Sequence, residues 1–356
     1  MIMLKVAITI PTIKSGGAEK QATLLASVLS NLCEVHFISV SGYSNAAQSN
    51  IAILKNAPGH VILHSLEGNI IKRILGLRKI LRDNSIDTVF NYLSYCDIIC
   101  GVTEKIVGVR NIYGGIRNSQ LPYGKYLLEK VVHNYISTLT IFNCYSGLEY
   151  FVERGFKKEK SIVIPNCFTN ISAPMFRLDK KVKKIITVGR FVQQKDYLTA
   201  IKTIATLRKR TTDFHFIIVG YGELEEVIRQ WVSKYEITDF TEILITPSNI
   251  PELLYEADLY LSTSLYEGTS NSIMEALNWS LPVVCTNVGD NSYLIQNNIN
   301  GFLHKVGDYE GMAHSLSLLI DNANMRQTLG TKGNTLLHNQ YSLETFSERY
   351  NQLLSI

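Results

Sequence analysis

The feature that most constrains the fold is an alternation of strand-like and helix-like segments that stops once and then restarts. Short runs rich in β-branched and aromatic residues, such as 6–10 and 34–40, alternate with segments such as 18–30, whose apolar residues recur at helical spacing. Strands that alternate with helices predict a parallel, doubly wound α/β sheet. The alternation resumes with a strand over 184–188 and ends in a helical tail.

The interruption between the two alternations indicates a domain boundary. Residues 165–184 contain two prolines, several small polar residues and a cluster of lysines, a composition typical of an interdomain linker. Two doubly wound domains would enclose a cleft, with ligands at the carboxyl ends of both sheets. The expected division is an N-terminal, acceptor-side α/β domain over 1–167, a linker over 168–184, a C-terminal, nucleotide-sugar-binding α/β domain over 185–340 and a helix over 341–356 that returns to the first domain.

Composition and charge narrow the function classes. The net charge of +4 is too small to predict nucleic-acid binding, although it allows contact with an anionic membrane surface. No run reaches the roughly 18 apolar residues of a membrane-spanning helix. The six cysteines lack metal-ligand spacing, which favours buried, reduced thiols, and no Asp-x-Asp motif is present. We therefore expect a cytoplasmic protein with no cofactor and no metal.

Paired glycines follow the first predicted strand. Gly16 and Gly17 stand directly before the first predicted helix. Glycine lets the backbone approach an anion closely, and a helix N-terminus offers free N–H groups and a partial positive charge. The dinucleotide fingerprint G-x-G-x-x-G and the Walker lysine motif are both absent. The pair is a candidate phosphate-binding turn, and a plain strand-to-helix turn is the alternative.

Two basic residues follow the first strand of the second alternation. Gly189 and Arg190 directly follow this predicted strand, and Lys195 stands five residues after Arg190. A guanidinium and an ammonium can converge on one diphosphate, the arginine as a fork and the lysine as a point charge. The motif therefore predicts a diphosphate site, and a solvated basic loop is the alternative.

The most informative segment, 266–276, contains two glutamates separated by seven residues. Glu267 ends a predicted strand at its carboxyl edge, and small or polar residues lead from it into a helix that contains Glu275. Both carboxylates can therefore point into one pocket that the helix N-terminus also faces, and each can accept hydrogen bonds from vicinal hydroxyls. The alternatives are an exposed loop acid for Glu267 and, for Glu275, a capping box with Ser272.

Together these motifs resemble the large retaining glycosyltransferase family 4, which has the GT-B fold. The resemblance rests on the paired glycines, the Gly-Arg pair with its lysine and the E-x7-E arrangement, and it continues through 281–284, Gly289 and Asn300–Gly301. It covers nearly the whole chain and is densest from 185 to 303. It implies two Rossmann-like domains with a cleft between them and the transfer of a sugar from a nucleotide-sugar donor.

The resemblance also implies a role for each residue that matches a motif. Arg190 and Lys195 would hold the diphosphate and offset the charge of the leaving group without a metal. Together with Glu267, which we expect to position the sugar, they form the catalytic set. The donor-binding candidates are Gly16, Gly17 and Gly189 near the phosphates, Thr246 and Pro247 at the base, Glu267, Gly268, Thr269, Ser270 and Asn271 along the sugar and its phosphate, and Glu275 at the ribose.

On the acceptor side the sequence departs from the family pattern. Many members carry a histidine or an aspartate there, whereas this chain has Arg117 and Asn118 after a predicted strand. This form is similar to members that build bacterial surface polysaccharides on lipid-linked acceptors. Arg117 and Asn118 are therefore acceptor-side candidates, with a structural salt bridge as the alternative for Arg117.

The expected function is the transfer of a hexose or N-acetylhexosamine, with retention, from a UDP-sugar to a lipid-linked or oligosaccharide acceptor of a bacterial O-antigen, capsule or exopolysaccharide. A nucleotide-sugar 2-epimerase and an inactive sugar-nucleotide-binding partner subunit are the alternatives. Segment 70–82 is apolar on one side and basic on the other, which predicts a helix on the inner face of the plasma membrane. The alternative is a helix that packs on the sheet with its basic side in water.

Overall fold

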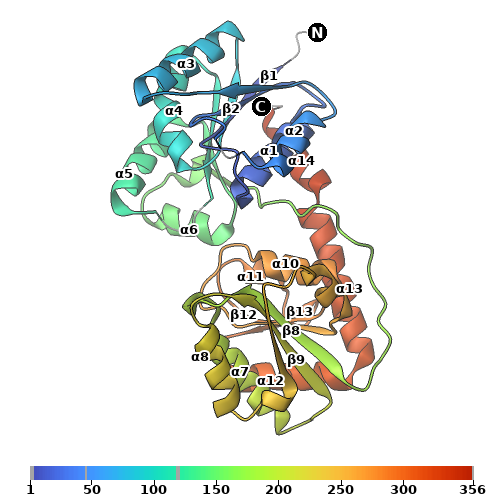
Figure 1. Ribbon diagram of the computed structural model, residues 1–356. Helices are drawn as coiled ribbons and strands as arrows, with labels where there is room; N and C mark the ends of the chain where they lie inside the picture. Colours follow the sequence, from blue (N-terminus) through green and yellow to red (C-terminus); the bar gives the residue numbers. More distant parts are fainter. Residues whose placement is uncertain (1–3, 45, 118–120, 355–356) are drawn as a thin grey trace. The chain divides into compact units, whose positions relative to one another are not determined.

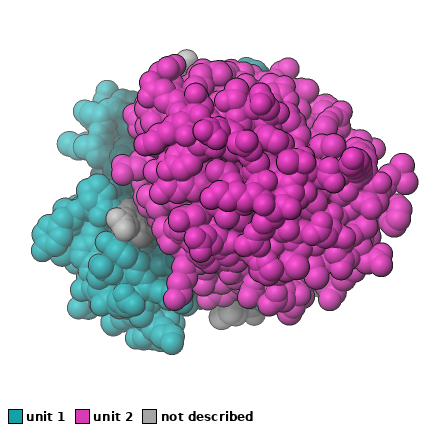
Figure 2. Space-filling model, turned by 90° about the horizontal axis from the view of Figure 1, so that it is seen from below, with its two compact units in different colours: residues 1–167, 343–356 teal, residues 168–342 magenta. Residues whose placement is uncertain are grey.

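Two parallel β-sheets organise the chain, which the computed structural model describes over residues 4–44, 46–117 and 121–354 (Figure 1). Met1–Cys167 and Leu343–Ile356 form unit 1, and Phe168–Ser342 form unit 2 (Figure 2). The expected α/β class with two doubly wound sheets is confirmed. Asn118, a predicted acceptor-side residue, lies outside the described residues.

The sheet of unit 1 has seven parallel strands in the order β3-β2-β1-β4-β5-β6-β7. These are β1 (Lys5–Ile10), β2 (Glu34–Ser39), β3 (Val61–Ser65), β4 (Thr88–Asn91), β5 (Asn111–Ile116), β6 (Leu139–Phe142) and β7 (Ser161–Val163). Its helices are α1 (Gly17–Leu29), α2 (Gln48–Lys55), α3 (Ile70–Asp83), α4 (Ser94–Val107), α5 (Tyr123–Val131), the π-helix η1 (Val132–Ile136), α6 (Tyr145–Glu153), the 3₁₀ helix η2 (Lys158–Lys160) and α14 (Leu343–Leu354).

The helices of unit 1 cover both faces of its sheet, because the strand order runs in opposite directions from β1 and β4. On one face α1 packs with the C-terminal helix α14, whose Phe346 and Tyr350 are buried in the same hydrophobic cluster as Leu25 of α1. On the other face α3 and α4 enclose a second cluster, which includes Leu77 and Cys100. The strand order reverses between β1 and β4, so the Gly16–Gly17 turn after β1 lies at the switch point of this sheet.

The sheet of unit 2 has six parallel strands in the order β10-β9-β8-β11-β12-β13. These are β8 (Lys183–Arg190), β9 (Phe214–Tyr221), β10 (Thr241–Ile245), β11 (Leu259–Ser262), β12 (Val283–Thr286) and β13 (Gly301–His304). Its helices are η3 (Gln193–Lys195), α7 (Tyr197–Arg208), α8 (Glu225–Lys234), η4 (Thr238–Phe240), α9 (Ile250–Glu256), α10 (Asn271–Asn278), α11 (Asn291–Leu294), α12 (Tyr309–Asp321) and α13 (Ala323–Tyr341).

The segment before β8, expected as a linker, is an extended strap on unit 2. The backbone N–H of Ser172 donates to Asn278 Oδ1 at 2.7 Å, and that of Met175 donates to Ser280 Oγ at 3.0 Å. Arg177 donates to several backbone carbonyls, including that of Ala257 at 2.8 Å. These hydrogen bonds explain why the strap groups with unit 2 in place of standing between the units.

Candidate active site

The predicted donor-binding residues gather at the carboxyl edge of the sheet in unit 2. All strands of this sheet are parallel, so the loops that follow them leave at one edge. The chain proceeds outward from β8 to β10 and then crosses back to β11, which makes the gap between β8 and β11 the topological switch point. The loop after β8 carries Lys195 and the loop after β11 carries Glu267, so both flank the place where ligands of such sheets bind.

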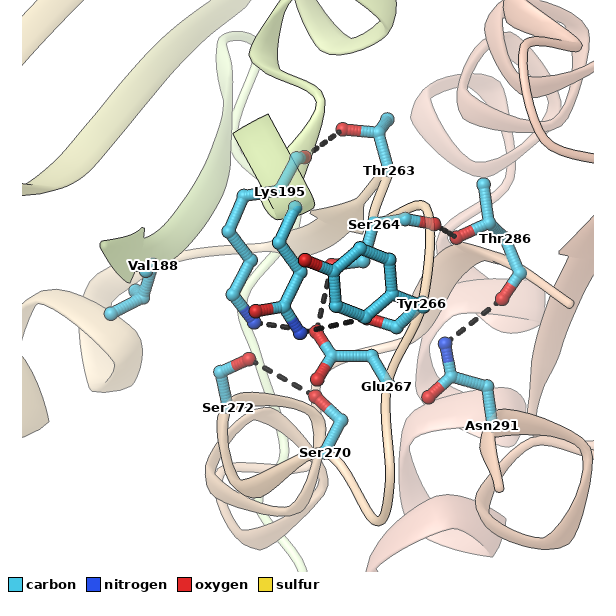
Figure 3. A network of polar contacts seen from close by, with 12 residues as sticks. Val188, Lys195, Thr263, Ser264, Tyr266, Glu267, Ser270, Ser272, Thr286 and Asn291 are labelled. Carbon is cyan, nitrogen blue, oxygen red and sulfur yellow. Dashed lines mark hydrogen bonds and ion pairs between the residues drawn. The ribbon is translucent and has the colours of Figure 1, made fainter. Parts of the chain in front are cut away.

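An ion pair joins these two loops. Lys195 Nζ lies 2.5 Å from Glu267 Oε1, and the two side chains are only 19% and 9% exposed. Ser264 Oγ donates a second hydrogen bond to the same carboxylate oxygen at 2.8 Å. Figure 3 shows Lys195 and Ser264 approaching Glu267 from different elements. The sequence placed Glu267 at the end of a strand, but β11 ends at Ser262 and Glu267 stands in the loop beyond it.

Further hydrogen bonds fasten the two loops together (Figure 3). Thr263 Oγ1 lies within hydrogen-bond distance of the Lys195 and Asp196 carbonyls, at 3.0 and 2.9 Å. Gln194 Nε2 donates to the Tyr266 carbonyl at 2.8 Å. Because backbone and side chains of both loops take part, Lys195 and Glu267 are held in place before any ligand arrives.

Gly289 lets a third loop, after β12, support Glu267 from behind. Its φ is +52°, and a Cβ at this position would lie 2.1 Å from the Glu267 carbonyl oxygen. The next residue, Asp290, donates its N–H to the Gly268 carbonyl at 3.2 Å and accepts a hydrogen bond from Thr269 Oγ1 at 3.4 Å. Only glycine combines this backbone conformation with this close approach.

Glu275 lies in α10 at a position that rules out the capping box considered from the sequence. The helix begins at Asn271 with Ser270 as its N-cap, so Ser272 is already inside the first turn, and no side chain caps the helix. Ser270 Oγ instead lies 3.2 Å from Ser272 Oγ. The alternative in which Glu275 forms a capping box with Ser272 is therefore wrong.

The negative charges of Glu267 and Glu275 both influence the hydroxyl group of Tyr260. Burial raises the pKa of Tyr260, and the negative charges of Glu275 and Glu267 raise it further, while a hydrogen bond with Ser272 lowers it. The Tyr260 hydroxyl also donates to the Val188 carbonyl at 3.2 Å. Both carboxylates of the E-x7-E arrangement are thus near enough to this buried hydroxyl, beside the β8–β11 switch point, to raise its pKa.

The remaining predicted donor residues of unit 2 line the same edge. Arg190 is the last residue of β8 and is exposed, and its guanidinium has no hydrogen-bond or ion-pair partner among the residues that the structure describes. Gly189 pairs with Gly220 of β9, where a Cβ would lie 1.8 Å from the Gly189 carbonyl oxygen. Thr246 has a φ of +42° and donates its N–H to the Gly220 carbonyl, so the Thr246–Pro247 turn lies beside β9.

The predicted residues of unit 1 lie in two places. Gly17 is the first residue of α1, and a Cβ there would meet nothing within 4 Å. The Arg117 guanidinium donates to the Tyr350 hydroxyl at 2.9 Å and to Asn166 Oδ1 at 3.3 Å, and it lies 4.4 Å from the centroid of the Tyr92 ring. Arg117 thus connects β5 to the C-terminal helix through neutral groups, and its acceptor-side role stays a prediction.

The structure also shows how the cysteines and the potential metal-ligating side chains are placed. All six cysteines are buried and free, which confirms the prediction of buried thiols. No group of three or more His, Cys, Asp or Glu side chains within residues 4–44, 46–117 and 121–354 is placed to hold a metal ion. Lys195 lies beside Glu267, and Arg190, at the end of β8, and the N-terminus of α10 bring further positive charge to loops of the same sheet.

Sequence reasoning missed the residues that support Glu267. Thr263 and Ser264 hold Lys195 and the carboxylate, Gln194 holds the loop backbone, and Asp290 holds Thr269 and Gly268. One signal was available, because small polar residues directly follow the buried strand β11. The contribution of Asp290 was not visible, because it comes from a loop more than 20 residues away.

Comparisons with known proteins show which family and which fold this chain resembles. Residues 171–335, nearly all of unit 2, match the family model for glycosyl transferases group 1. The chain is 24% identical, over 92% of both chains, to a Campylobacter jejuni GalNAc-α-(1→4)-GalNAc-α-(1→3)-diNAcBac-PP-undecaprenol α-1,4-N-acetyl-D-galactosaminyltransferase. It is 23% identical, over 70% of both chains, to an Escherichia coli UDP-Gal:α-D-GlcNAc-diphosphoundecaprenol α-1,3-galactosyltransferase.

The fold is also that of solved glycosyltransferase structures. Anabaena HepE, solved in complex with UDP, superposes with a TM-score of 0.79 at 17% identity, over 99% of this chain and 100% of that one. The pair of parallel sheets, the cationic switch point with its two glutamates and the family match over unit 2 lead to one assignment. The chain is a glycosyltransferase of GT-B fold, and its residues 171–335 match the group 1 glycosyltransferases, the family 4 that its motifs resemble.

Proposed function

We propose that this protein transfers a hexose or N-acetylhexosamine from a UDP-sugar to a lipid-linked or oligosaccharide acceptor, with retention of anomeric configuration. The product belongs to a bacterial surface polysaccharide, that is, an O-antigen, a capsule or an exopolysaccharide. The names of the Campylobacter and Escherichia relatives, which contain undecaprenol diphosphate acceptors, support this acceptor class. The UDP bound to Anabaena HepE supports the nucleotide.

The single observation that carries the proposal is the largely buried ion pair between Lys195 and Glu267 at the switch point. A donor brings two groups that suit this pair, the sugar hydroxyls for the carboxylate and the diphosphate for the ammonium. Ser264 keeps its hydrogen bond to Glu267 when Lys195 turns to the phosphate. Glu267 therefore positions the sugar, and Lys195 contributes charge to the leaving group.

The charge of the leaving group determines the rate of such a transfer. As the bond between the anomeric carbon and the phosphate oxygen breaks, negative charge grows on the diphosphate. Lys195, the exposed guanidinium of Arg190 and the free N–H groups of α10 can stabilise that charge without a metal. The acceptor oxygen bonds to the same face of the anomeric carbon, and its proton passes to the departing phosphate oxygen.

Other residues bind the parts of the donor and acceptor that do not react. Glu275 accepts hydrogen bonds from the ribose hydroxyls, and the Thr246–Pro247 turn contacts the base. In unit 1 the N-terminus of α1 at Gly16 and Gly17 offers free N–H groups that suit a phosphate. Arg117 remains the acceptor-side candidate.

The test is an incubation of the whole chain with a panel of labelled UDP-sugars and a short-chain polyprenyl diphosphate sugar as acceptor. The expected result is one transferred sugar in α linkage, because the donor is an α-linked nucleotide sugar and configuration is retained. A parallel incubation without acceptor separates the alternatives. Release of a free epimer would identify an epimerase, and donor binding without either hydrolysis or transfer would identify an inactive partner subunit. Either outcome overturns the proposal.

A further inference from the structure

We propose that the outward side of α3, α4 and α5 in unit 1 is a docking surface for an anionic lipid bilayer. We call it the outer helical face and define it as the exposed side chains of Ile70–Asp83, Ser94–Val107 and Tyr123–Ile136, the last range including the π-helix η1. The inference deepens the proposed function, on which it rests, because a lipid-linked acceptor is met at a bilayer surface.

The three helices form one continuous layer. Each connects consecutive parallel strands on the same side of the sheet, α3 from β3 to β4, α4 from β4 to β5 and α5 from β5 to β6. α4 packs against both α3 and α5, and Figure 1 shows the three along one side of the sheet. Their outward side chains therefore share one surface.

This layer exposes an unusual amount of apolar surface. Ten of the 23 large hydrophobic side chains that are exposed in the described residues lie on these helices, so the face stands out from the rest of the protein. Four of them form a stripe at four-residue steps along α5 and η1, with exposed fractions of 76% for Tyr123, 43% for Leu127, 53% for Val131 and 72% for Tyr135. A soluble helix normally buries such a stripe.

α3 mixes apolar and basic residues on its exposed side. Ile71, Leu75, Arg78 and Arg82 recur at helical spacing, and all four are exposed. The side that packs on the sheet carries Leu77 instead, which is 1% exposed. The sequence predicted an apolar side and an opposite basic side, but the structure places apolar and basic residues together on the outside.

Charge on the outer helical face is almost entirely positive. Among its exposed residues the cations are Lys72, Arg78, Lys79, Arg82 and Lys105. The acids of α4 and α5 point inward, since Glu104 is 0% and Glu129 is 1% exposed, and so does Asp97. Asp83 is the one exposed acid on these three helices, all of whose residues are described. A surface of this sign attracts anionic headgroups.

The combination of chemistries fits a bilayer better than a folded partner. A bilayer surface receives separate apolar side chains among headgroups without a matching shape, and it attracts lysine and arginine at the same depth. Tyrosines favour that interface, and here Tyr123 and Tyr135 stand at both ends of the stripe, with Lys157 Nζ 5.4 Å from the centroid of the Tyr135 ring. No helix in the described part of the chain is long and apolar enough to span a bilayer, so this contact would be peripheral.

The experiment is flotation of the whole chain with vesicles of phosphatidylcholine that contain phosphatidylglycerol, or with pure phosphatidylcholine vesicles. We expect binding to the anionic vesicles that weakens as salt is added. The variant Lys79→Gln/Arg82→Gln should lower the partition coefficient about 25-fold, because each cation near an anionic surface contributes about fivefold. The variant Leu127→Ser/Val131→Ser should lower it as well, by removing apolar contact without changing charge.

Matched controls come from unit 2. Lys209→Gln/Lys234→Gln removes the same charge from exposed positions, and Phe176→Ser/Leu178→Ser removes exposed apolar side chains. These variants should bind vesicles like the wild type. If the variants in unit 2 lost as much vesicle binding as those in unit 1, the binding would depend only on overall charge or hydrophobicity. The proposal of a docking surface on the outer helical face would then be wrong.

Donor hydrolysis, measured without vesicles, separates this proposal from the proposed function. All four variants should hydrolyse donor like the wild type, because none lies among the donor-binding residues. If the wild type hydrolyses the donor but does not bind anionic vesicles at low salt, the docking surface is wrong and the proposed function is unaffected. Light scattering gives the last outcome: if the wild type is a dimer that Leu127→Ser/Val131→Ser makes monomeric, the face binds a second copy and the bilayer proposal is wrong.

Discussion

Lys195 and Glu267 face each other across the topological switch point of unit 2, with 2.5 Å between ammonium and carboxylate and with Ser264 on the same oxygen. The two residues are 72 positions apart in the chain. They meet because β8 and β11 are parallel neighbours whose loops leave the same edge. Each charge offsets the cost of burying the other, because both side chains are largely shielded from water.

The first prediction concerns the charge at this pair. Lys195→Met should lower kcat about 100- to 1000-fold, because it removes one preorganised positive group from the leaving diphosphate. Lys195→Arg should recover part of the rate, since it restores the charge with a different geometry. Steady-state kinetics with saturating donor measure both effects.

Lys184→Met is the matched control for this experiment. Lys184 also forms an ion pair, 2.7 Å from Glu256, but it stands at the opposite end of β8 and is exposed. Its loss should leave kcat nearly unchanged. If Lys195→Met or Glu267→Ala kept nearly full turnover, the assigned roles at the switch point would be wrong.

The second prediction separates nucleotide binding from chemistry. Glu275→Gln should weaken UDP binding by about tenfold or more, because hydrogen bonds to a charged carboxylate are replaced by weaker ones. kcat at saturating donor should change much less, since the ribose does not react. Calorimetric titration with UDP and kinetics provide the two readouts. Glu252→Gln, at an exposed acid of α9, should bind UDP normally, and an unaltered UDP affinity in Glu275→Gln would exclude the ribose contact.

The third prediction tests the support behind Glu267. Gly289→Ala combines a positive φ with a Cβ placed 2.1 Å from the Glu267 carbonyl oxygen, so the loop must shift. We expect a loss of stability above about 1 kcal/mol and a large loss of activity. Gly307→Ala is the control, because Gly307 also has a positive φ, +79°, but nothing lies within 4 Å of its Cβ. It should cost stability and leave activity intact, and equal activity losses in both variants would exclude a role for the close contact.

The fourth prediction follows from carboxyl groups buried in unit 1. Burial raises the pKa of Asp97 to about 7 and that of Glu104 to about 8. Asn91 Nδ2 donates to Glu104 Oε2 at 2.9 Å, and the Gly115 N–H donates to Asp97 Oδ2 at 3.0 Å. The folded protein thus holds protons that the unfolded chain releases from about pH 4. Stability from these groups must therefore fall as pH rises towards about 8.

Glu104→Gln isolates this effect, because the amide keeps the shape and cannot ionise. The melting temperature of the variant minus that of the wild type should increase between about pH 5 and about pH 9, by an amount corresponding to a free energy of a few kcal/mol. Glu153→Gln, at an exposed side chain, should show a difference that does not change with pH. A constant difference for Glu104→Gln as well would mean that this carboxyl is already ionised in the folded protein at low pH.

Many strands and helices could be predicted from local sequence patterns, and the elements that were missed have sequences without a clear pattern. β1, β2 and β8 were predicted because most of their residues are buried and their sequences are therefore rich in apolar and β-branched side chains. β3 was missed because its side chains are half exposed at the edge of the sheet and give no clear period. The helix α4 was missed because it follows β4 closely and carries buried polar residues, such as Asp97 and Glu104, among its apolar ones.

The sequence by itself determined the E-x7-E segment, the Gly-Arg pair with Lys195 and the alternation of strands with helices in two blocks, because each of these depends on residues that are close together in the chain. Only the tertiary structure decided what these residues touch. Glu275 lies inside α10 and raises the pKa of the buried Tyr260, and Arg117 holds the C-terminal helix through Tyr350. Such partners come from distant parts of the chain, and strand pairing, which depends on burial over the whole sheet, brings them together. The motif Glu267–Glu275 therefore predicted where a donor would bind, and the parallel order β8–β11 brought Lys195 to Glu267.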